Sequence, residues 1–271
     1  MDHEHSKVVL ITGARSGIGR ACALAMVDQG YRVYGTSRTS PDEDLGFTFL
    51  EMDVDDTASV EAGVQTILDQ TGRLDVVVNN AGWGYGGAVE DTSIDEAKAL
   101  FETNFYGVLR VCHAVLPTMR AQRSGLIVNV SSIGGLMGVP YQGLYSASKF
   151  AVNGLTAAMR MEVRPWNIDV VVLAPGDIRT PFTANRQHTV GSRRSEVYEA
   201  AYARALARIE SDEENGAAPE VVGRALVRIV NARVRRPVYV VGPFYQKLAV
   251  LASRILPRRV LHRLIMLNYG L

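Results

Sequence analysis

Cysteine is scarce in this chain of 271 residues, which contains only Cys22 and Cys112. Both lie in apolar patterns of helical period, which does not suit the dense disulfide framework of small secreted proteins. Cysteines without disulfides are typical of a reducing compartment, so a cytoplasmic protein is expected. The N-terminus also lacks the basic and then apolar order of a signal peptide.

Long apolar runs are missing too, since no segment reaches the ~20 residues of a membrane-spanning helix. The composition, 47% hydrophobic and 21% charged, is ordinary for a globular protein. A chain of this length can bury a large core, so one domain over residues 1–271 is expected. No nucleic-acid module and no metal site are predicted, and His3 and His5 are interpreted as part of a disordered tail.

Acidic residues are absent from Val221 to Leu271, although ten Lys and Arg residues fall there. Because the whole chain has a formal charge of only +1, the remainder is acidic. Residues 243–271 alternate these cations with apolar side chains, as a basic amphipathic tail does. Such a tail could lie on anionic lipid, or it could pack on an acidic surface of its own chain or of a partner. We favour packing.

The N-terminal stretch has the order strand, glycine-rich turn and helix. An apolar strand over 7–11 runs into Thr12–Gly19, and a helical pattern follows. Gly13 permits the tight turn, Gly17 lets the backbone approach a pyrophosphate, and Gly19 allows close packing of helix on strand. The free N–H groups of the helix would face the phosphates. This pattern predicts a dinucleotide site.

Cofactor choice is predicted at the end of the second strand, 32–37. A carboxylate at this position commonly binds the ribose 2′-hydroxyl of NAD. Here the residues are Ser37 and Arg38, with Arg15 in the phosphate turn. Two guanidinium groups suit a 2′-phosphate, so NADP(H) is predicted to be preferred over NAD(H).

Further short strands alternate with helices along the chain. They cover 47–52, 74–78, 126–130, 168–173 and 237–241. This alternation predicts an α/β fold: a Rossmann-like, doubly wound, parallel seven-stranded sheet with helices on both faces. Ligands bind such sheets at the carboxyl ends of the strands, where most of the polar motifs of this chain fall.

The chemistry is predicted at a Tyr-x-x-x-Lys pair. Tyr145 and Lys149 lie on one face of a helix, so the ammonium could lower the pKa of the phenol toward neutrality. One of the two serines at the end of the preceding strand, Ser131 or Ser132, could hold a substrate oxygen against the phenol. Alone, the pair could equally be a surface tyrosine and a solvated lysine. Asn104, within an apolar stripe, could be a satisfied core amide or a site group.

Taken together, the motifs resemble the short-chain dehydrogenase/reductase superfamily in its single-domain form. They are Thr12–Gly19, Asn79–Gly82, Asn104, Ser132, Tyr145 with Lys149, and Pro175–Gly176. The resemblance implies that Tyr145 is the catalytic acid/base and that Ser132, rather than Ser131, polarises the substrate oxygen. It also implies that Lys149 lowers the Tyr145 pKa and binds the nicotinamide ribose, and that Asn104 holds a water in a proton relay.

The predicted site comprises two further sets of residues. The residue patterns and the resemblance together predict cofactor contacts from Gly13, Arg15, Ser16, Gly17, Ile18, Gly19, Ser37, Arg38, Asp53, Val54, Asn80, Ala81, Gly82, Tyr145, Lys149, Pro175, Gly176, Ile178 and Thr180. The predicted substrate contacts are Ser132, Met137, Tyr141, Tyr145 and Phe182.

The predicted function is an NADP-dependent oxidoreductase that interconverts a ketone or aldehyde and an alcohol. The segment 134–151 is similar to 17β-hydroxysteroid and retinol dehydrogenases, which implies an apolar substrate such as a steroid, retinoid or aryl ketone. The alternative is a non-catalytic NADP-binding sensor on the same fold. A sensor would be expected to lack Ser132, Tyr145 or Lys149, and all three are present.

The segment after the sixth strand, 182–215, is a candidate substrate lid, with a charged helix over 195–209 and an acidic turn over 210–214. The resemblance also implies a homodimer or homotetramer, built on the helix that begins at Tyr145. Its predicted outer face comprises Ala151, Leu155, Ala158 and Val163.

Overall fold

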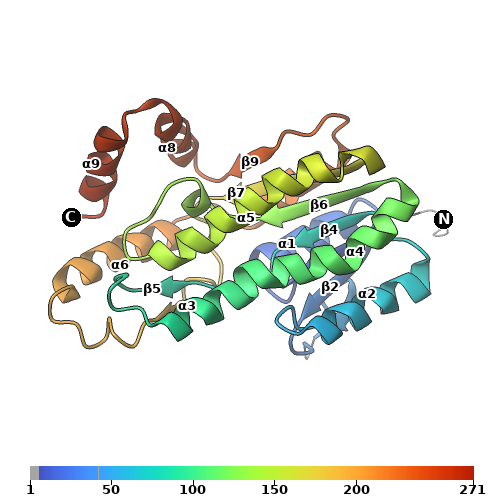
Figure 1. Ribbon diagram of the computed structural model, residues 1–271, viewed down its shortest axis with the longest axis horizontal. Helices are drawn as coiled ribbons and strands as arrows, with labels where there is room; N and C mark the ends of the chain where they lie inside the picture. Colours follow the sequence, from blue (N-terminus) through green and yellow to red (C-terminus); the bar gives the residue numbers. More distant parts are fainter. Residues whose placement is uncertain (1–5, 42) are drawn as a thin grey trace.

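The computed structural model describes residues 6–41 and 43–271, and its centre is a sheet of seven parallel strands (Figure 1). In sheet order the strands are β3 (Thr48–Glu51), β2 (Arg32–Ser37), β1 (Val8–Thr12), β4 (Val76–Asn79), β6 (Gly125–Val130), β7 (Ile168–Pro175) and β9 (Val238–Val241). The predicted fold class is confirmed. The predicted N-terminal tail with His3 and His5 lies outside the described residues.

Strand β1 is the point at which the strand order reverses. It pairs with β2 on one side and with β4 on the other, so that Ile11 lies between Gly35 and Val78. The connections leave this point in opposite directions, which opens a crevice above the carboxyl ends of the strands. The glycine-rich turn follows β1 and therefore enters that crevice.

Helices cover both faces of the sheet, as the strands require because they are apolar on both sides. One face carries α1 (Gly17–Val27) and α7 (Glu220–Asn231); the other carries α2 (Thr57–Thr71), α4 (Val108–Gln122) and α5 (Gly143–Glu162). Cys22 and Leu226 share one buried cluster with Val9, whereas Val115 and Val152 share the other with Leu10. Both cysteines are free and buried, as predicted.

Short irregular helices adjoin the strand ends. Helix α3 (Ile94–Phe101) continues through a π-helical turn, Glu102–Gly107, into α4. Single 3₁₀ turns follow β6 at Ile133–Gly135 and precede β7 at Arg164–Trp166. A π-turn inside a helix re-aims the side chains that follow it, and this one holds Asn104.

Residues 182–215, which we call the cover, lie against the segment that follows β4. A small parallel sheet of β5 (Tyr85–Gly86) and β8 (Gln187–His188) joins the two segments. The helix of the cover, α6, spans Glu199–Glu214. The predicted acidic turn at 210–214 was therefore wrong, because these residues form the last turn of α6, with Asp212 paired to Arg208 one turn earlier.

The C-terminal tail forms two helices, α8 (Phe244–Ile255) and α9 (Arg258–Asn268), which stand at the edge of the molecule (Figure 1). Gln246 of α8 is buried and accepts a hydrogen bond of 2.9 Å from the backbone N–H of Asp177. Arg204 of α6 donates a hydrogen bond of 3.2 Å to the carbonyl of Gly270. The tail thus folds back onto its own chain.

The outer face of α5 was predicted in the wrong register. Val163 is only 5% exposed and belongs to the core, and Leu155 packs against the same cluster. The exposed residues of α5 instead recur at Ala147, Phe150, Gly154, Ala157 and Met161. The helix rotates in this way because Val152 and Met159 bury their side chains against the sheet.

Candidate active site

The glycine-rich turn provides a backbone cradle at the start of α1. Gly13 and Gly17 have φ angles of 65° and 55°, a region in which residues with a Cβ are strained. A Cβ at Gly13 would lie 2.8 Å from the Cα of Ala81, and one at Gly17 would lie 3.3 Å from the Cβ of Thr180. The hydroxyl of Ser16 makes no capping bond to α1. The cradle therefore fits the pyrophosphate of a dinucleotide.

Thr12 connects this turn to the segment after β4 by hydrogen bonds. This role was not predicted from the sequence. Its hydroxyl oxygen accepts hydrogen bonds of 3.0 Å from the backbone N–H groups of Asn80 and Ala81. The Asn80 amide in turn donates a hydrogen bond of 2.9 Å to the Thr12 carbonyl. Hydrogen bonds thus connect the two motifs. Thr12 stands directly before the first glycine of the turn, and this position is the sequence feature from which its role could have been predicted.

At the end of β2, Ser37 is half-buried and Arg38 is exposed. Arg15 reaches the same place, because it donates a hydrogen bond of 2.6 Å to the hydroxyl of Thr39. The Arg15 guanidinium thus lies near the end of β2, where Arg38 is also located. At the end of β3, the Asp53 carboxylate accepts a hydrogen bond of 3.0 Å from the backbone N–H of Asp55. Beside Asp53, Val54 is buried.

Lys149 and Tyr145 meet at the end of β6. The Lys149 side chain is buried, and its ammonium donates a hydrogen bond of 3.1 Å to the carbonyl of Val130. The ammonium nitrogen lies 5.8 Å from the centre of the Tyr145 ring. The spacing of four residues therefore places both groups on one face of α5, as expected.

Burial dominates the electrostatics of this pair. It raises the pKa of the Tyr145 phenol to about 12, even though a hydrogen bond with Ser132 lowers that pKa. It also lowers the pKa of the Lys149 ammonium to about 8. Burial of the phenol therefore acts against the lowering of the Tyr145 pKa that the resemblance implies for Lys149. A phenol that stays protonated at neutral pH can donate a proton.

The two serines after β6 have different surroundings. The Ser131 hydroxyl is buried and donates a hydrogen bond of 3.3 Å to the Lys149 carbonyl. The Ser132 hydroxyl accepts a hydrogen bond of 3.0 Å from the backbone N–H of Gly134, and it reaches the Tyr145 phenol. Ser132 is therefore the serine that faces the reacting position.

Asn104 is fully buried in the π-helical turn. Its amide nitrogen donates hydrogen bonds of 2.9 Å to the Trp83 carbonyl and 3.2 Å to the Ser148 hydroxyl. Its oxygen accepts one of 3.0 Å from the Trp83 backbone N–H. The Ser148 hydroxyl also donates to the Tyr145 carbonyl, at 2.7 Å. Asn104 is thus a satisfied amide that joins the segment after β4 to α5. We call Asn104, Ser132, Tyr145 and Lys149 the catalytic floor.

The segment after β7 closes the cofactor side of the crevice. Gly176 is held by a hydrogen bond of 2.7 Å from its N–H to the Val241 carbonyl, and a Cβ there would collide with Gln246. The Ile178 side chain is buried in the core, so any contact with a cofactor has to come from its backbone. Thr180 lies beside Gly17.

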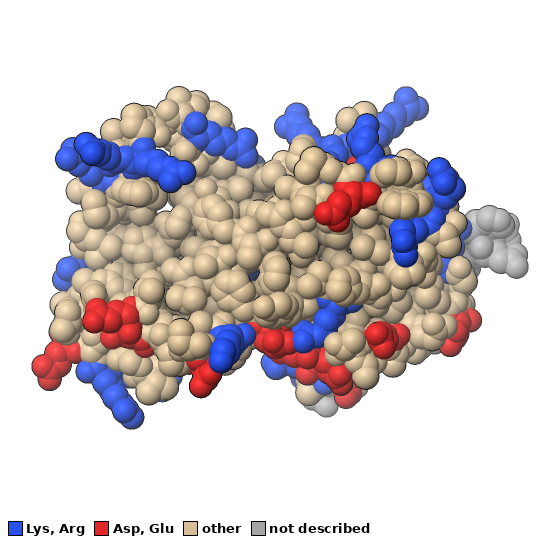
Figure 2. Space-filling model, in the orientation of Figure 1, with Lys and Arg blue, Asp and Glu red and all other residues tan. Residues whose placement is uncertain are grey.

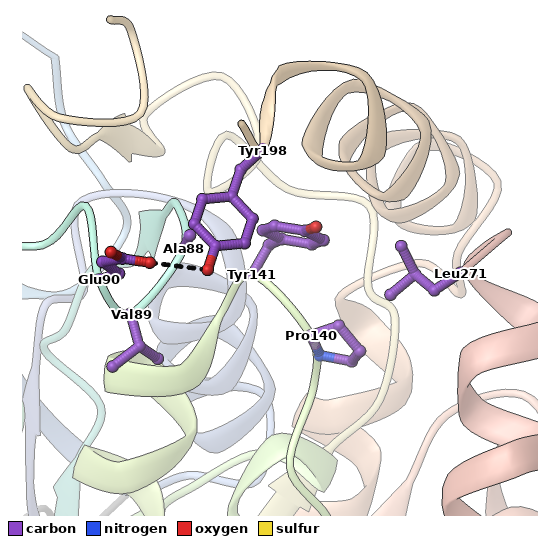
Figure 3. A pocket seen from close by; sticks show the side chains of 7 residues that line it. All are labelled: Ala88, Val89, Glu90, Pro140, Tyr141, Tyr198 and Leu271. Atoms are coloured by element: carbon purple, nitrogen blue, oxygen red, sulfur yellow. Dashed lines mark hydrogen bonds between the residues drawn. The ribbon is translucent and has the colours of Figure 1, made fainter. Parts of the chain in front are cut away.

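An apolar pocket with a volume of about 550 Å³ opens beside Tyr141 (Figure 3). It is lined by Ala88, Val89, Glu90, Pro140, Tyr141, Tyr198 and Leu271. The Tyr141 ring lies against the rings of Tyr198 and Tyr202, with centroids 6.5 Å and 5.4 Å away. Of these lining residues, only Tyr141 was predicted from the sequence. The others come from four separate segments.

Two other predicted substrate residues lie nearer the floor. The ring of Phe182, from the start of the cover, lies 5.6 Å from that of Tyr145. Met137 is half-buried after the 3₁₀ turn that follows Ser132. A second pocket, of about 320 Å³, lies next to Thr180 and contains Glu210, Glu213 and Glu214. Arg179 also lines this second pocket, so it is polar, with three acids and one cation, whereas the pocket beside Tyr141 is apolar.

The comparison with known families agrees with this geometry. The family model described as short chain dehydrogenase matches residues 7–191. The chain belongs to the short-chain dehydrogenase/reductase family. The matched region begins before the glycine-rich turn and includes the whole catalytic floor.

Individual relatives extend the similarity beyond that region. The chain is 43% identical to 3-ketodihydrosphingosine reductase from Bacteroides thetaiotaomicron over 267 residues, which is 98% of each chain. It is 31% identical to dehydrogenase/reductase SDR family member 7B from Xenopus tropicalis, over 87% of this chain and 77% of that one. A short-chain dehydrogenase structure from Streptomyces avermitilis has a TM-score of 0.80 at 29% identity, covering 100% and 98%.

These comparisons identify the chain as an NAD(P)-dependent oxidoreductase. The alternative of a non-catalytic sensor is disfavoured, because Ser132, Tyr145 and Lys149 are present and close together.

Proposed function

We propose that this short-chain dehydrogenase is an NADPH-dependent reductase of a long-chain amino ketone of the 3-ketodihydrosphingosine type. The observation that carries the proposal is the 43% identity to a 3-ketodihydrosphingosine reductase over 98% of both chains. Because the similarity runs through the cover and the tail, it includes segments that select the substrate as well as the floor that performs the chemistry.

The catalytic floor provides the groups that reduction of a ketone requires. When bound, the nicotinamide supplies the hydride. Ser132 and Tyr145 donate hydrogen bonds to the ketone oxygen, and Tyr145 passes its proton to that oxygen as negative charge develops. The raised pKa of Tyr145, about 12, keeps the phenol protonated for this step. Lys149 holds the nicotinamide ribose, and Asn104 positions the elements around it.

Preference for NADPH is assigned to Arg15 and Arg38. Both lie at the end of β2, where Ser37 replaces the carboxylate that would bind a free 2′-hydroxyl. Guanidinium groups bind phosphate through charged, paired hydrogen bonds, so two of them favour the 2′-phosphate.

The two pockets match the two ends of such a substrate, which has an alkyl chain on one side of its ketone and an amino alcohol on the other. The apolar pocket beside Tyr141 suits the alkyl chain. In the second pocket, Glu213 is already bound by Arg186 and Thr183. Of the other two acids, Glu210 is half-buried and Glu214 is exposed, so we assign Glu210 to the substrate ammonium.

The cover acts as the substrate lid, and Phe182 and Met137 enclose the ketone. Assembly as a homodimer or homotetramer is assigned to the face of α4 and α5, which is almost free of charge in Figure 2. Phe150 and Met161 on this face are 46% and 72% exposed. Burying them in a two-fold contact would brace α5 from behind.

The test is a substrate panel with purified protein and NADPH. It contains 3-ketodihydrosphingosine, a short-chain analogue, the long-chain ketone without its amine, and steroid, retinoid and aryl ketones. We expect kcat/KM for 3-ketodihydrosphingosine to exceed that for the short analogue by about 100-fold, because each buried CH₂ contributes about 0.8 kcal/mol. Turnover of an aryl ketone without turnover of the amino ketone would refute the assignment.

Two substitutions test the roles of the two pockets separately. Glu210→Gln should raise KM for the amino ketone by about tenfold and leave the ketone without an amine unchanged. Val89→Asp should raise KM for long-chain substrates only. As a matched control, Glu199→Gln alters an exposed acid at the other end of α6 and should change neither value.

A further inference from the structure

Helix α8 carries a stripe of large apolar side chains that faces outward. Phe244, Leu248, Leu251 and Ile255 are 74%, 49%, 53% and 72% exposed. Their spacing of four, three and four residues places them on one face of the helix. Four such residues in a row on an exposed face differ from the single apolar residues that are normal on protein surfaces.

The opposite face of α8 packs on the body of the protein. Gln246 and Val250 are buried there, at 7% and 4% exposure. The Gln246 side chain hydrogen bonds to the Asp177 carboxylate and backbone N–H, which anchors the start of the helix. The orientation of α8 is therefore held by these contacts, and its most apolar side is left toward solvent.

Helix α9 and the C-terminus repeat the arrangement. Val260, Leu264, Leu267 and Leu271 are 43%, 51%, 74% and 41% exposed, again at intervals of four, three and four residues. No described residue of α9 is buried. The two consecutive helices thus present two apolar stripes of the same period.

Cations flank both stripes. Lys247 and Arg254 follow Phe244 and Leu251 by three residues on α8, and Arg263 follows Val260 by three on α9. Each cation therefore lies at the same side of its stripe. Figure 2 shows Lys and Arg side chains at the upper left, where α8 and α9 lie, with no acidic side chain among them. Residues 221–271 contain no Asp or Glu at all.

We propose that α8 and α9 dock on the surface of a bilayer that contains anionic phospholipid. Apolar side chains would enter the boundary between headgroups and acyl chains, and the flanking cations would contact the phosphates. Docking is at the surface, since none of the described helices is long and apolar enough to cross a membrane.

Charge decides between lipid and a second copy of the chain as the occupant. A two-fold contact places the same surface on both subunits. Here it would bring Lys247, Arg254 and Arg263 close to their own symmetry copies, with no acid in the tail to offset them. An anionic bilayer complements both the apolar stripes and the positive charge of this surface.

The docking surface also borders the apolar pocket. Leu271, which follows the end of α9 at Asn268, is exposed and lines the pocket beside Tyr141 (Figure 3). If the substrate is the amphiphile proposed above, docking would place the pocket entrance at the lipid surface. That last step rests on the proposed function; the binding of lipid does not.

The experiment is flotation of the full-length protein with phosphatidylcholine vesicles, with and without phosphatidylglycerol. We expect at least tenfold tighter binding to the anionic vesicles at low salt, and weaker binding as salt rises. Leu248→Ser/Leu251→Ser and Arg254→Gln/Arg263→Gln should each weaken binding by about tenfold or more. Each variant should keep wild-type turnover of a short water-soluble ketone, which shows that it is folded.

Matched controls are Arg224→Gln/Arg228→Gln, which removes two exposed cations from α7, and Val197→Ser/Val234→Ser, which removes two exposed apolar groups elsewhere. Both should bind vesicles like the wild type. Equal binding to neutral and anionic vesicles, or no effect of the α8 and α9 variants, would overturn the proposal. The proposal would also be overturned if the wild-type protein formed an oligomer that does not bind vesicles and light scattering showed that Leu248→Ser/Leu251→Ser dissociates it. Because this readout uses no substrate, it can fail or succeed independently of the proposed function.

Discussion

The catalytic floor and the cover are held in place by different kinds of contact. The floor depends on the backbone: Lys149 donates to the carbonyl of Val130, and Asn104 exchanges hydrogen bonds with the backbone of Trp83. The cover is joined to the segment after β4 by the short sheet of β5 and β8 and by side-chain pairs such as Tyr198 with Glu90, and Arg186 and Glu213 pair within it. A site built on strand ends keeps its geometry when surrounding residues change. Side-chain pairs change with the residues that form them, so we expect the cover to vary more readily than the floor.

The strongest test of the floor is Tyr145→Phe, which removes only the phenolic hydroxyl. We expect kcat to fall by about 10³- to 10⁴-fold with the NADPH dissociation constant unchanged, because general acid catalysis contributes about that much. Steady-state kinetics and cofactor titration measure the two effects. Turnover within about tenfold of the wild type would show that another group donates the proton.

The corresponding test of the cover is Arg186→Met. The Arg186 side chain is only 1% exposed and pairs with Glu213, so its loss leaves a carboxylate that is 13% exposed without its cation and with only the Thr183 hydroxyl bound to it. We expect a loss of about 3–5 kcal/mol in the free energy of unfolding, measured by urea denaturation. Arg186→Met/Glu213→Leu should recover much of that loss.

Arg208→Met is the matched control for this pair. Arg208 pairs with Asp212 on the same helix, but its side chain is 48% exposed. The change in stability should stay below about 1 kcal/mol, since solvent screens exposed pairs. If both variants lost equal stability, the cover would not depend on its buried pair.

The proposed 2′-phosphate site at the end of β2 can be tested with Arg38→Ala. We expect the dissociation constant of NADPH to rise by about tenfold to 100-fold and that of NADH to change little, because only NADPH has the 2′-phosphate. Arg32→Ala, at the other end of β2, should affect neither cofactor. Equal weakening of both cofactors by Arg38→Ala would mean that Arg38 does not contact the 2′-phosphate.

The last test of the floor is the pH profile of ketone reduction. The pKa of Lys149 is lowered to about 8, so the ammonium is charged below pH 8 and loses its charge as pH rises through that value. Tyr145, with a pKa near 12, stays protonated over the same range. We expect kcat/KM for a ketone without an amine to fall about tenfold per pH unit above 8. The residual activity of Lys149→Arg should lack this decline, because a guanidinium stays charged. A flat wild-type profile to pH 10 would contradict the lowered pKa.

Most of the fold followed from local sequence patterns. The seven strands, the glycine-rich turn and the order of the floor residues were predicted because strand alternation and helical spacing are properties of short segments. The choice of Ser132 over Ser131 also agrees with their hydrogen bonds. Tyr145 and Lys149 were predicted to share a helix face, because they are four positions apart in the sequence.

Three features needed the tertiary structure. The apolar pocket is formed by residues as distant as Val89, Tyr198 and Leu271, and no spacing along the chain relates them. The outer face of α5 depends on which residues the sheet buries, and the apolar pattern alone placed it wrongly. The direction in which the Tyr145 pKa is shifted depends on how much water is excluded around the phenol, which a sequence does not encode locally.

The sequence by itself therefore determined the reaction class, because the groups that carry it lie at strand ends and one helical turn apart. Only the tertiary structure decided what surrounds those groups. Burial, pocket shape and the outward orientation of the apolar stripes on α8 and α9 are sums over many distant contacts, and the buried side of each helix is chosen by the surface that it meets.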